Sequence, residues 1–379
     1  MTTKRKRGQS EGSIYRRKSD GRWAGAVSLG NGKRKTVYGR TADAARQKID
    51  DIKRQITDGT FVSSDRLTVE QLSKQYIDSL RTTVRRSTYR RYETLLKIHV
   101  LPVIGTYQVK QVLPAQLESI YSGILRKGLS AQSAVHVHRV VHAMLAKATR
   151  WQLIGRNVAS LVKPPRVEYR EMRTLTPQEV KQLFFAASGT RFEALWRLAI
   201  GTGMRLGEIL ALKWQFVDFD RRSIRVVATL ESDPELGLIN SEPKTKSSRR
   251  TIHLTDSVLR ALESHRARQN QERMKLGNAW TDNDYVFASA IGTPVIMQNL
   301  GRRDFKNLRK SAGITGYLRM HDLRHTAISL ALSAGVAPTD VSNMAGHSNV
   351  AVTLQRYAHA LPEAPRRAAD AIERLVAGS

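Results

Sequence analysis

The segment "MHDLRHTAISLALSAG" places three potential cations directly before an apolar run. His321, Arg324 and His325 are three and four residues apart, so on a helix they share one face. The run that follows, residues 327–332, is typical of a buried helix. Polar groups that enter a core need partners or a purpose. Fixed guanidinium and imidazole groups are well suited to stabilising an anion such as a phosphate.

A second anion-binding feature lies in "IGTGMRLGEILAL". Gly201 and Gly203 are predicted to end one helix, and Arg205 to begin the next. A helix start has free backbone N–H groups that favour phosphate, so an arginine here is well placed to bind one. Glu208 follows three residues later and could hold the guanidinium, although a purely structural Arg–Glu pair would have the same spacing.

Two further segments carry reactive groups. "PKTKSSRRTIHL" presents Lys244 and Lys246 on a polar turn between predicted strands, where a flexible hairpin could carry a lysine into a groove. Basic hairpins are also common as solvated sheet edges, so this pattern has little weight by itself. In "MAGHSNVAVTLQRYAHA", His347 follows Gly346 at a turn, and Tyr357 comes ten residues later in a helix rich in small residues.

The charge of the chain points to a polyanion as its partner. Lysine and arginine number 63 against 33 acidic residues, a net charge of +30. Residues 1–65, 66–171 and 172–379 carry net charges of +9, +12 and +9, so the excess is spread along the chain. This is more than solubility requires, and it predicts nucleic acid contacted by every part of the chain. The chain has no cysteine, which excludes disulfides, thiolate zinc sites and a cysteine nucleophile.

The elements that precede these residues form separate predicted modules. Residues 1–11 are predicted to be a disordered basic tail, and residues 12–60 a small DNA-binding module. Three short strands, the last two joined at Gly30-Asn31-Gly32, precede a helix capped by Thr41. A β-ribbon of this kind can enter a major groove, and a solvated strand face is the alternative. The predicted DNA contacts of this module are Arg16, Arg17, Arg22, Lys33, Arg34 and Lys35.

Residues 66–165 are predicted to form a module of four helices, the first opened by a capping-box pattern at Thr68 and Gln71. Residues 172–379 are mostly helical with one strand region. The fold class is therefore multidomain and mainly α with small β elements: a three-stranded sheet plus helix, a four-helix domain and a mixed α+β domain. Basic residues along the four helices suit the DNA backbone. Those contacts are predicted at Arg85, Arg86, Arg90, Arg91, Arg139 and Lys147.

Taken in order, "TGMRLGE", "PKTKSSRR", "HDLRH" and "AGHSNVAVTLQRYAH" resemble a tyrosine recombinase of the phage-integrase family. The similarity covers the last domain in detail, and the two modules before it resemble the arm-binding and core-binding domains of the family. One departure is Ala345, where the family usually has leucine before Gly-His. The resemblance implies supporting roles for Glu208 and His325, and Lys246 competes with Lys244. The implied catalytic residues are Arg205, Lys244, His321, Arg324, His347 and the nucleophile Tyr357.

The resemblance implies that DNA strands are cut and rejoined through a 3′-phosphotyrosine with a free 5′-hydroxyl. Two guanidiniums would stabilise the charge that develops on the phosphate. A lysine could not reproduce the planar, forked pair of N–H donors that a guanidinium offers. A phenol has an ordinary pKa of about 10, and that of Tyr357 would lose its proton to His321. Lys244 would protonate the departing 5′-oxygen, and His347 would donate a hydrogen bond to the phosphate. Neither ATP nor a metal is expected, because the covalent link stores the bond energy and the sequence has no carboxylate cluster.

The partners implied by the resemblance are double-stranded DNA, with core and arm attachment sites, and further copies of the chain in a homotetramer that passes through a Holliday junction. An excisionase and a host DNA-bending protein are additional partners of such an integrase, which would insert a phage or integrative element into a chromosome. The tail "APRRAADAIERLVAGS" is predicted to be an amphipathic helix that packs on a neighbouring protomer.

No run approaches a membrane span, so we expect a cytoplasmic, bacterial protein that is associated with the nucleoid through its DNA. The alternatives are an Xer-like resolvase, a type IB topoisomerase and a catalytically inactive regulator on the same scaffold. The strand module at residues 12–57 argues against the first two. The complete set of six catalytic residues argues against the third.

Overall fold

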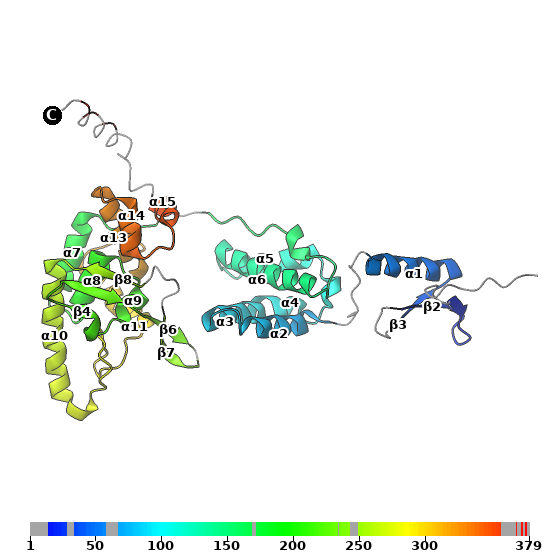
Figure 1. Cartoon of the computed structure of the whole chain (residues 1–379), viewed down its shortest axis with the longest axis horizontal. Helices are drawn as coiled ribbons and strands as arrows, with labels where there is room; N and C mark the ends of the chain where they lie inside the picture. Colours follow the sequence, from blue (N-terminus) through cyan, green and yellow to red (C-terminus); the bar gives the residue numbers. More distant parts are fainter. Residues whose placement is uncertain are drawn as a thin grey trace, which may run out of the picture. The chain divides into compact units, whose positions relative to one another are not determined.

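The computed structural model describes residues 14–28, 34–57, 67–168, 172–233, 235–242 and 249–357, together with the single residues Ala369, Glu373 and Val376. The chain divides into two compact units, Met1–Tyr169 and Arg170–Ser379 (Figure 1). Outside the described residues lie Lys33, the hairpin turn at residues 30–32, the lysines at 244 and 246 and, apart from the three single residues named above, the predicted tail helix.

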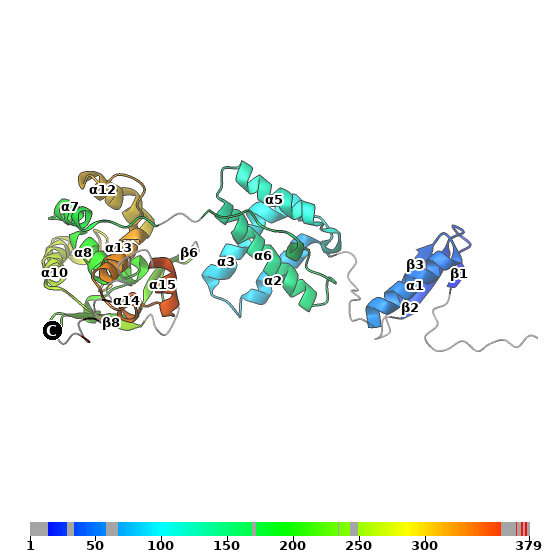
Figure 2. The ribbon, with the colours of Figure 1, turned by 90° about the horizontal axis from the view of Figure 1, so that it is seen from above.

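The N-terminal elements of the first unit are a three-stranded antiparallel sheet and one helix that lies across it (Figure 2). Its elements are β1 (Ile14–Arg16), β2 (Trp23–Ser28), β3 (Arg34–Gly39) and α1 (Ala42–Thr57). Val27 and Val37 pack against Ile49 of the helix. A Cβ atom at Gly25 would lie 2.5 Å from Ile49 Cδ1, so glycine is needed where the helix approaches β2 closely. The predicted Thr41 cap is confirmed, because its hydroxyl accepts from the backbone N–H of Ala44 at 3.2 Å.

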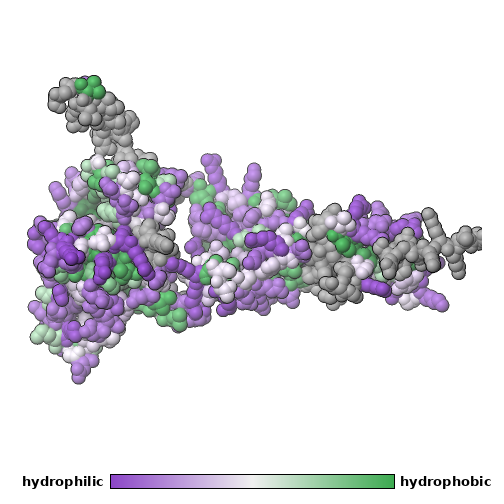
Figure 3. Space-filling view, in the orientation of Figure 1, coloured by the Kyte–Doolittle hydropathy of each residue, from purple (hydrophilic) through white to green (hydrophobic). Residues whose placement is uncertain are grey.

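The second part of this unit is the predicted set of helices. Its elements are α2 (Val69–Leu80), α3 (Arg86–Leu95), α4 (Leu101–Ile104), α5 (Pro114–Arg126) and α6 (Ala131–Arg150). A π-helical turn, Leu96–Val100, joins α3 to α4, and the capping box at Thr68 and Gln71 is present. Leu72, Leu117 and Val137 are fully buried in a core that α2, α5 and α6 share. Hydrophilic residues cover much of the visible surface of these helices (Figure 3).

The second unit surrounds a buried helix, α8, which packs against α10 and α13. Leu195, Trp196 and Leu198 of α8 are almost completely buried in its main core. The helices are α7 (Pro177–Ala187), α8 (Glu193–Thr202), α9 (Leu206–Leu210), α10 (Asp256–Leu276), α11 (Met297–Asn299), α12 (Lys306–Ser311), α13 (Met320–Ser333), α14 (Pro338–Ala345) and α15 (Val350–Tyr357). The strands are β4 (Val217–Asp218), β5 (Ser223–Val226), β6 (Thr229–Asp233), β7 (Gly237–Ser241) and β8 (Arg250–His253).

Among the described residues of this unit, the strands form two small sheets. One has the order β4-β5-β8, and the other is the β6-β7 hairpin. The lysines at 244 and 246 were predicted on a polar turn between strands, and strands β7 and β8 precede and follow the segment that contains them. These two strands belong to different sheets, because β7 pairs with β6 and β8 pairs with β5. Within the described parts of the chain, no helix combines the length and the apolar character needed to cross a membrane.

Candidate active site

The junction between α8 and α9 holds the first arginine. Helix α8 ends at Gly203, whose φ of +62° is the left-handed conformation that glycine adopts without strain. Arg205 is the N-cap of α9, as the sequence predicted. Its Nη1 donates to Glu208 Oε1 at 2.8 Å, and its Nη2 donates to the carbonyl oxygen of Gly346 at 3.0 Å. Glu208 is 3% exposed, so the guanidinium is held by a buried carboxylate on one side and by the α14–α15 turn on the other.

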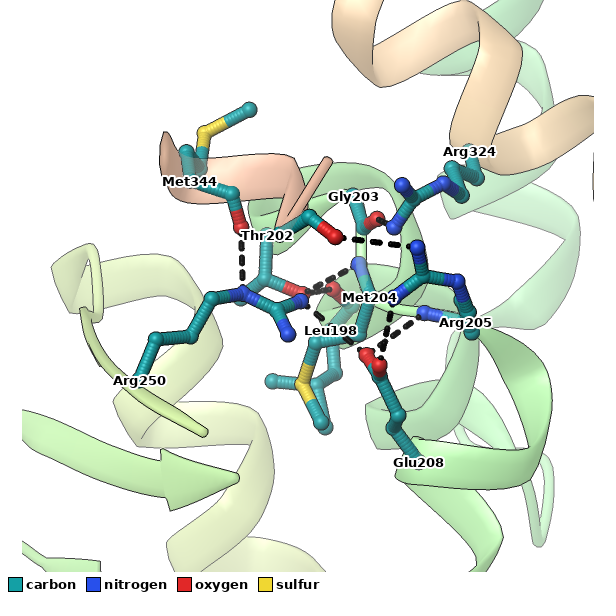
Figure 4. Close-up of polar contacts among 10 residues, drawn as sticks. Leu198, Thr202, Gly203, Met204, Arg205, Glu208, Arg250, Arg324 and Met344 are labelled. Atoms are coloured by element: carbon teal, nitrogen blue, oxygen red, sulfur yellow. Dashed lines mark hydrogen bonds and ion pairs between the residues drawn. The ribbon is translucent and has the colours of Figure 1, made fainter. Parts of the chain in front are cut away.

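Helix α13 carries the second arginine. Arg324 is 4% exposed, and its Nη1 donates to the carbonyl oxygen of Gly203 at 2.7 Å (Figure 4). Burial, and then the positive charge of Arg205, lower the pKa of Arg324 from its ordinary 12.5 to about 10. The ring of His321 meets that of His325 edge to face, with 4.8 Å between centroids. The three residues that the sequence placed on one helical face line one pocket together with Arg205.

The segment from α14 to α15 provides the third group of residues. Gly346 ends α14 with a φ of +68°, and His347 follows it. The Nδ1 atom of His347 lies 2.7 Å from the hydroxyl oxygen of Thr353, a residue with no exposed surface. Tyr357 is the last residue of α15 and is 1% exposed, and its hydroxyl hydrogen-bonds to Nδ1 of His325. The phenol thus contacts His325, for which the resemblance implied a supporting role.

One pocket collects these side chains. It lies between the start of α9, the start of α13 and the α14–α15 segment. Five of the six residues predicted to be catalytic line it, and the sixth, Lys244, lies outside the described residues. The complete lining is Arg205, His321, Arg324, His325, His347, Ser348, Val352, Arg356 and Tyr357.

The three imidazoles of the pocket have lowered pKa values. Burial lowers the pKa of His347 to about 4, and the charges of Arg324 and Arg205 contribute. Burial and the neighbouring His321 lower the pKa of His325 to about 4. The pKa of His321 is also lowered, by burial and by Arg324. At neutral pH the rings are uncharged, so each has one donating and one accepting nitrogen.

Sequence reasoning missed one buried cation beside the pocket. Arg250, the first residue of β8, has an 8% exposed side chain. Its Nη2 donates to Glu208 Oε2 at 3.0 Å, and its Nε donates to the carbonyl oxygen of Met344 at 2.7 Å. The basic run in which it lies, "SSRRT", has the appearance of a solvated strand edge. Nothing local in the sequence separates Arg250 from its exposed neighbour Arg249.

The basic residues predicted to contact DNA lie on other elements of the chain. Each one that the structure describes is exposed or partly exposed, and Lys33 lies outside the described residues. Arg17 already pairs with Asp20 at 3.0 Å and lies over the ring of Tyr38. Lys147 lies 5.4 Å from the ring centroid of Trp151. These contacts orient the cations without burying them, and their role in DNA binding stays a prediction.

Comparison with known proteins identifies the family. The description "Phage integrase family" matches residues 173–364, half of the chain, and "Phage integrase, N-terminal SAM-like domain" matches residues 68–125. The chain belongs to the phage integrase family. It is therefore a tyrosine recombinase, an enzyme of site-specific DNA recombination, as the order of its four motifs implied.

Relatives of this recombinase cover up to 98% of its length. A tyrosine recombinase described as XerC-like, from Caldanaerobacter subterraneus, is 27% identical and covers 91% of this chain and 93% of its own. An integrase from Saccharopolyspora erythraea is 26% identical over 98% of both chains. The Tn1549 transposon integrase, solved with transposon right end DNA, matches with a TM-score of 0.68 and 25% identity over 82% of this chain and 100% of its own. A lambda integrase tetramer bound to a Holliday junction has a TM-score of 0.56 and 17% identity over 93% of this chain and 96% of its own, which supports the fold.

Proposed function

We propose that this recombinase is an integrase that cuts DNA with Tyr357 and stabilises the attacked phosphate with Arg205 and Arg324. The observation that carries the proposal is the single pocket in which two braced guanidiniums, His347 and Tyr357 come together. A phosphodiester under attack accumulates charge on its two non-bridging oxygens. Two guanidiniums already held by Glu208 and by the carbonyl oxygen of Gly203 need little reorganisation to meet that charge.

His347 is proposed to donate a hydrogen bond to the same phosphate. Its ring is neutral at pH 7, and its Nδ1 faces the hydroxyl of Thr353. We assign the hydroxyl as the donor in that contact, which puts the ring proton on Nε2. A neutral imidazole fixed in this tautomer can donate to an anion without changing its protonation state.

The proton of Tyr357 has two candidate acceptors. His321 is the acceptor that the resemblance implies. The contact with the Tyr357 hydroxyl makes His325 its rival, and the two rings touch. The variants His321→Gln and His325→Gln separate them. Loss of the acceptor is expected to make cleavage rise with pH up to the phenol pKa of about 10, whereas loss of the other ring lowers the rate at every pH.

The remaining assignments rest on the resemblance and on the relatives. Lys244 is proposed to protonate the departing 5′-oxygen, with Lys246 as its alternative. Solved relatives include an integrase with transposon end DNA and a tetramer on a Holliday junction. This supports double-stranded DNA and a homotetramer as partners here. Residues 12–60 are proposed to bind arm sites, residues 66–165 to bind the core site and residues 172–379 to catalyse. An excisionase, a host DNA-bending protein and a bacterial cytoplasmic location complete the proposal.

A nicked suicide duplex tests the chemistry, because loss of a short 5′-hydroxyl fragment traps the covalent intermediate. The intact chain should form a protein–DNA adduct that resists denaturing gel electrophoresis, and Tyr357→Phe should not. Tyr317→Phe is the matched control, since Tyr317 is 77% exposed and does not line the pocket. Absence of an adduct with the intact chain would favour the inactive regulator. An Xer-like resolvase would recombine equally well without residues 1–60 and without arm sites.

A further inference from the structure

The buried arginine at the start of β8 lies behind the pocket. Arg250 and Glu208 are not among the residues that line the pocket, yet they contact each other at 3.0 Å directly behind Arg205 (Figure 4). Glu208 binds Arg205 twice, since Oε1 accepts from Nη1 at 2.8 Å and Oε2 accepts from the backbone N–H at 3.1 Å. Arg250 therefore shares the carboxylate that holds a residue proposed to bind the phosphate.

The second contact of Arg250 reaches the other side of the pocket. Its Nε donates to the carbonyl oxygen of Met344 in the last turn of α14. Two residues later, the carbonyl oxygen of Gly346 accepts from Nη2 of Arg205 at 3.0 Å, and His347 comes next. The guanidinium of Arg250 thus links β8 to Glu208 and to the end of α14, which leads to Gly346 and His347. Glu208 and Gly346 are the two residues that hold Arg205.

The backbone at this turn is shaped around Arg250. A Cβ atom on Gly346 would lie 2.8 Å from Nη1 and 3.0 Å from Cζ of Arg250. The guanidinium therefore packs against the glycine backbone, and the positive φ of Gly346 turns the chain toward His347. A side chain of another shape at position 250 would leave this turn without its support.

The charges in this cluster depend on one another. Burial raises the pKa of the Glu208 carboxyl, but hydrogen bonds from Arg250 and Arg205 and their charges outweigh burial and lower it below its ordinary value. The carboxylate stays ionised and can hold both cations. Removing Arg250 would leave Glu208 buried with one cationic partner fewer, and its contact with Arg205 would change.

We propose that Arg250 is a positioning residue for strand cleavage, which fixes Arg205 through Glu208 and fixes His347 through the end of α14. This inference rests on the proposed function, because it assumes that Arg205 and His347 act on the phosphate. The side chain of Arg250 is 8% exposed and does not line the pocket, so this role requires no contact between Arg250 and DNA. Its loss should slow the chemical step while the affinity for DNA is retained.

The experiment compares Arg250→Met and Arg250→Lys with Arg191→Met. Arg191 is a matched control in the same unit, because it also donates to a glutamate, Glu272 at 2.7 Å, and to a backbone carbonyl oxygen, that of Ala288 at 3.2 Å. Single-turnover cleavage of the suicide duplex, DNA affinity and thermal melting are measured for each. Both Arg250 variants should cleave about 10- to 100-fold more slowly with DNA affinity within about twofold, and Arg191→Met should cleave at the normal rate.

A second cycle tests the route through Glu208. The double variant Glu208→Gln/Arg250→Met should show a smaller fold-reduction in cleavage rate than the product of the fold-reductions of the two single variants. The reason is that both changes act on the same support of Arg205. Normal cleavage by folded Arg250→Met, or by Arg250→Lys if the former does not fold, would overturn the proposal. The proposal would also be overturned if the cleavage rate fell in proportion to the melting temperature, and to the same extent in Arg250→Met and Arg191→Met. A wild-type chain that forms no adduct would instead refute the proposed function from which this inference starts.

Discussion

Replacing Arg324 by lysine separates the shape of this cation from its charge. Arg324 is 4% exposed and already uses Nη1 on the carbonyl oxygen of Gly203. The planar fork leaves its other N–H groups for a phosphate oxygen. A lysine has one compact ammonium group at the same site and cannot keep the backbone contact and a forked phosphate contact together. Arg324→Lys should therefore bind DNA and cleave poorly.

The size of the effect follows from the contacts that are lost. A hydrogen bond to a charged group contributes about 1.5–3 kcal/mol, which corresponds to a cleavage rate about 10- to 150-fold lower. Burial and Arg205 lower the pKa of Arg324 from 12.5 to about 10. The same burial and the same neighbouring Arg205 would lower the pKa of an ammonium group at this position below the ordinary lysine value of about 10.4. The variant should thus lose its remaining activity as pH rises, because the ammonium group deprotonates at a lower pH than an exposed lysine.

Single-turnover cleavage of a nicked suicide duplex, measured from pH 6 to 9.5, gives the rate, and fluorescence anisotropy with the same duplex gives the affinity. Arg319→Lys is the control. Arg319 caps the same helix, pairs with Asp322 at 2.9 Å and has a 54% exposed side chain. The Arg319→Lys variant should cleave at the wild-type rate. If Arg324→Lys also cleaved at the wild-type rate with the wild-type pH profile, fork geometry would be irrelevant. Equal losses of binding and cleavage would refute the assignment of Arg324 to the chemical step.

Three further predictions follow from the same unit. Thr353→Val removes the hydroxyl that fixes the His347 ring, and should lower the cleavage rate about tenfold at unchanged DNA affinity in the suicide-duplex assay. The free energy of unfolding should fall as pH drops from 6.5 to 4, because His325 and His347 have folded pKa values of about 4 and the unfolded chain takes up protons first. Thermal melting between pH 5 and 7 checks this, and the dependence should be smaller in His325→Gln. Removal of residues 364–379 should weaken tetramer assembly on DNA, and native gels that show unchanged synapsis would contradict the predicted tail helix.

The sequence predicted those parts of the site that depend on local structure. Gly203, Arg205 and Glu208 are close in the chain, so a helix end, a helix start and a three-residue spacing are enough to place them. The shared face of His321 and Arg324 follows in the same way from the helical period. The helices around them were also predictable, because capping residues such as Thr68 mark their starts locally.

The missing parts depend on long-range packing. Contact between His325 and Tyr357 spans 32 residues and exists because α15 packs near α13. The burial of Arg250 depends on Glu208 and Met344, which lie 42 and 94 residues away in the chain. The two-sheet arrangement around β8 has the same origin, since β8 pairs with β5 and leaves β7 to the hairpin with β6. Periodicity within one element carries no information on these distances.

The proposed nucleophile, Tyr357, belongs to a small core of its own. Tyr357 packs with Ile328, Leu332, Val341 and Ala345 in a cluster that is separate from the large core around α8. Opening of α14 and α15 would expose this small cluster and leave the large core intact, so its free energy should be well below that of global unfolding. Backbone amides of α15 should then exchange hydrogen faster than those of α8. Local opening of this kind would release the proposed nucleophile, while the helices that hold Arg205 and Arg324 stay folded.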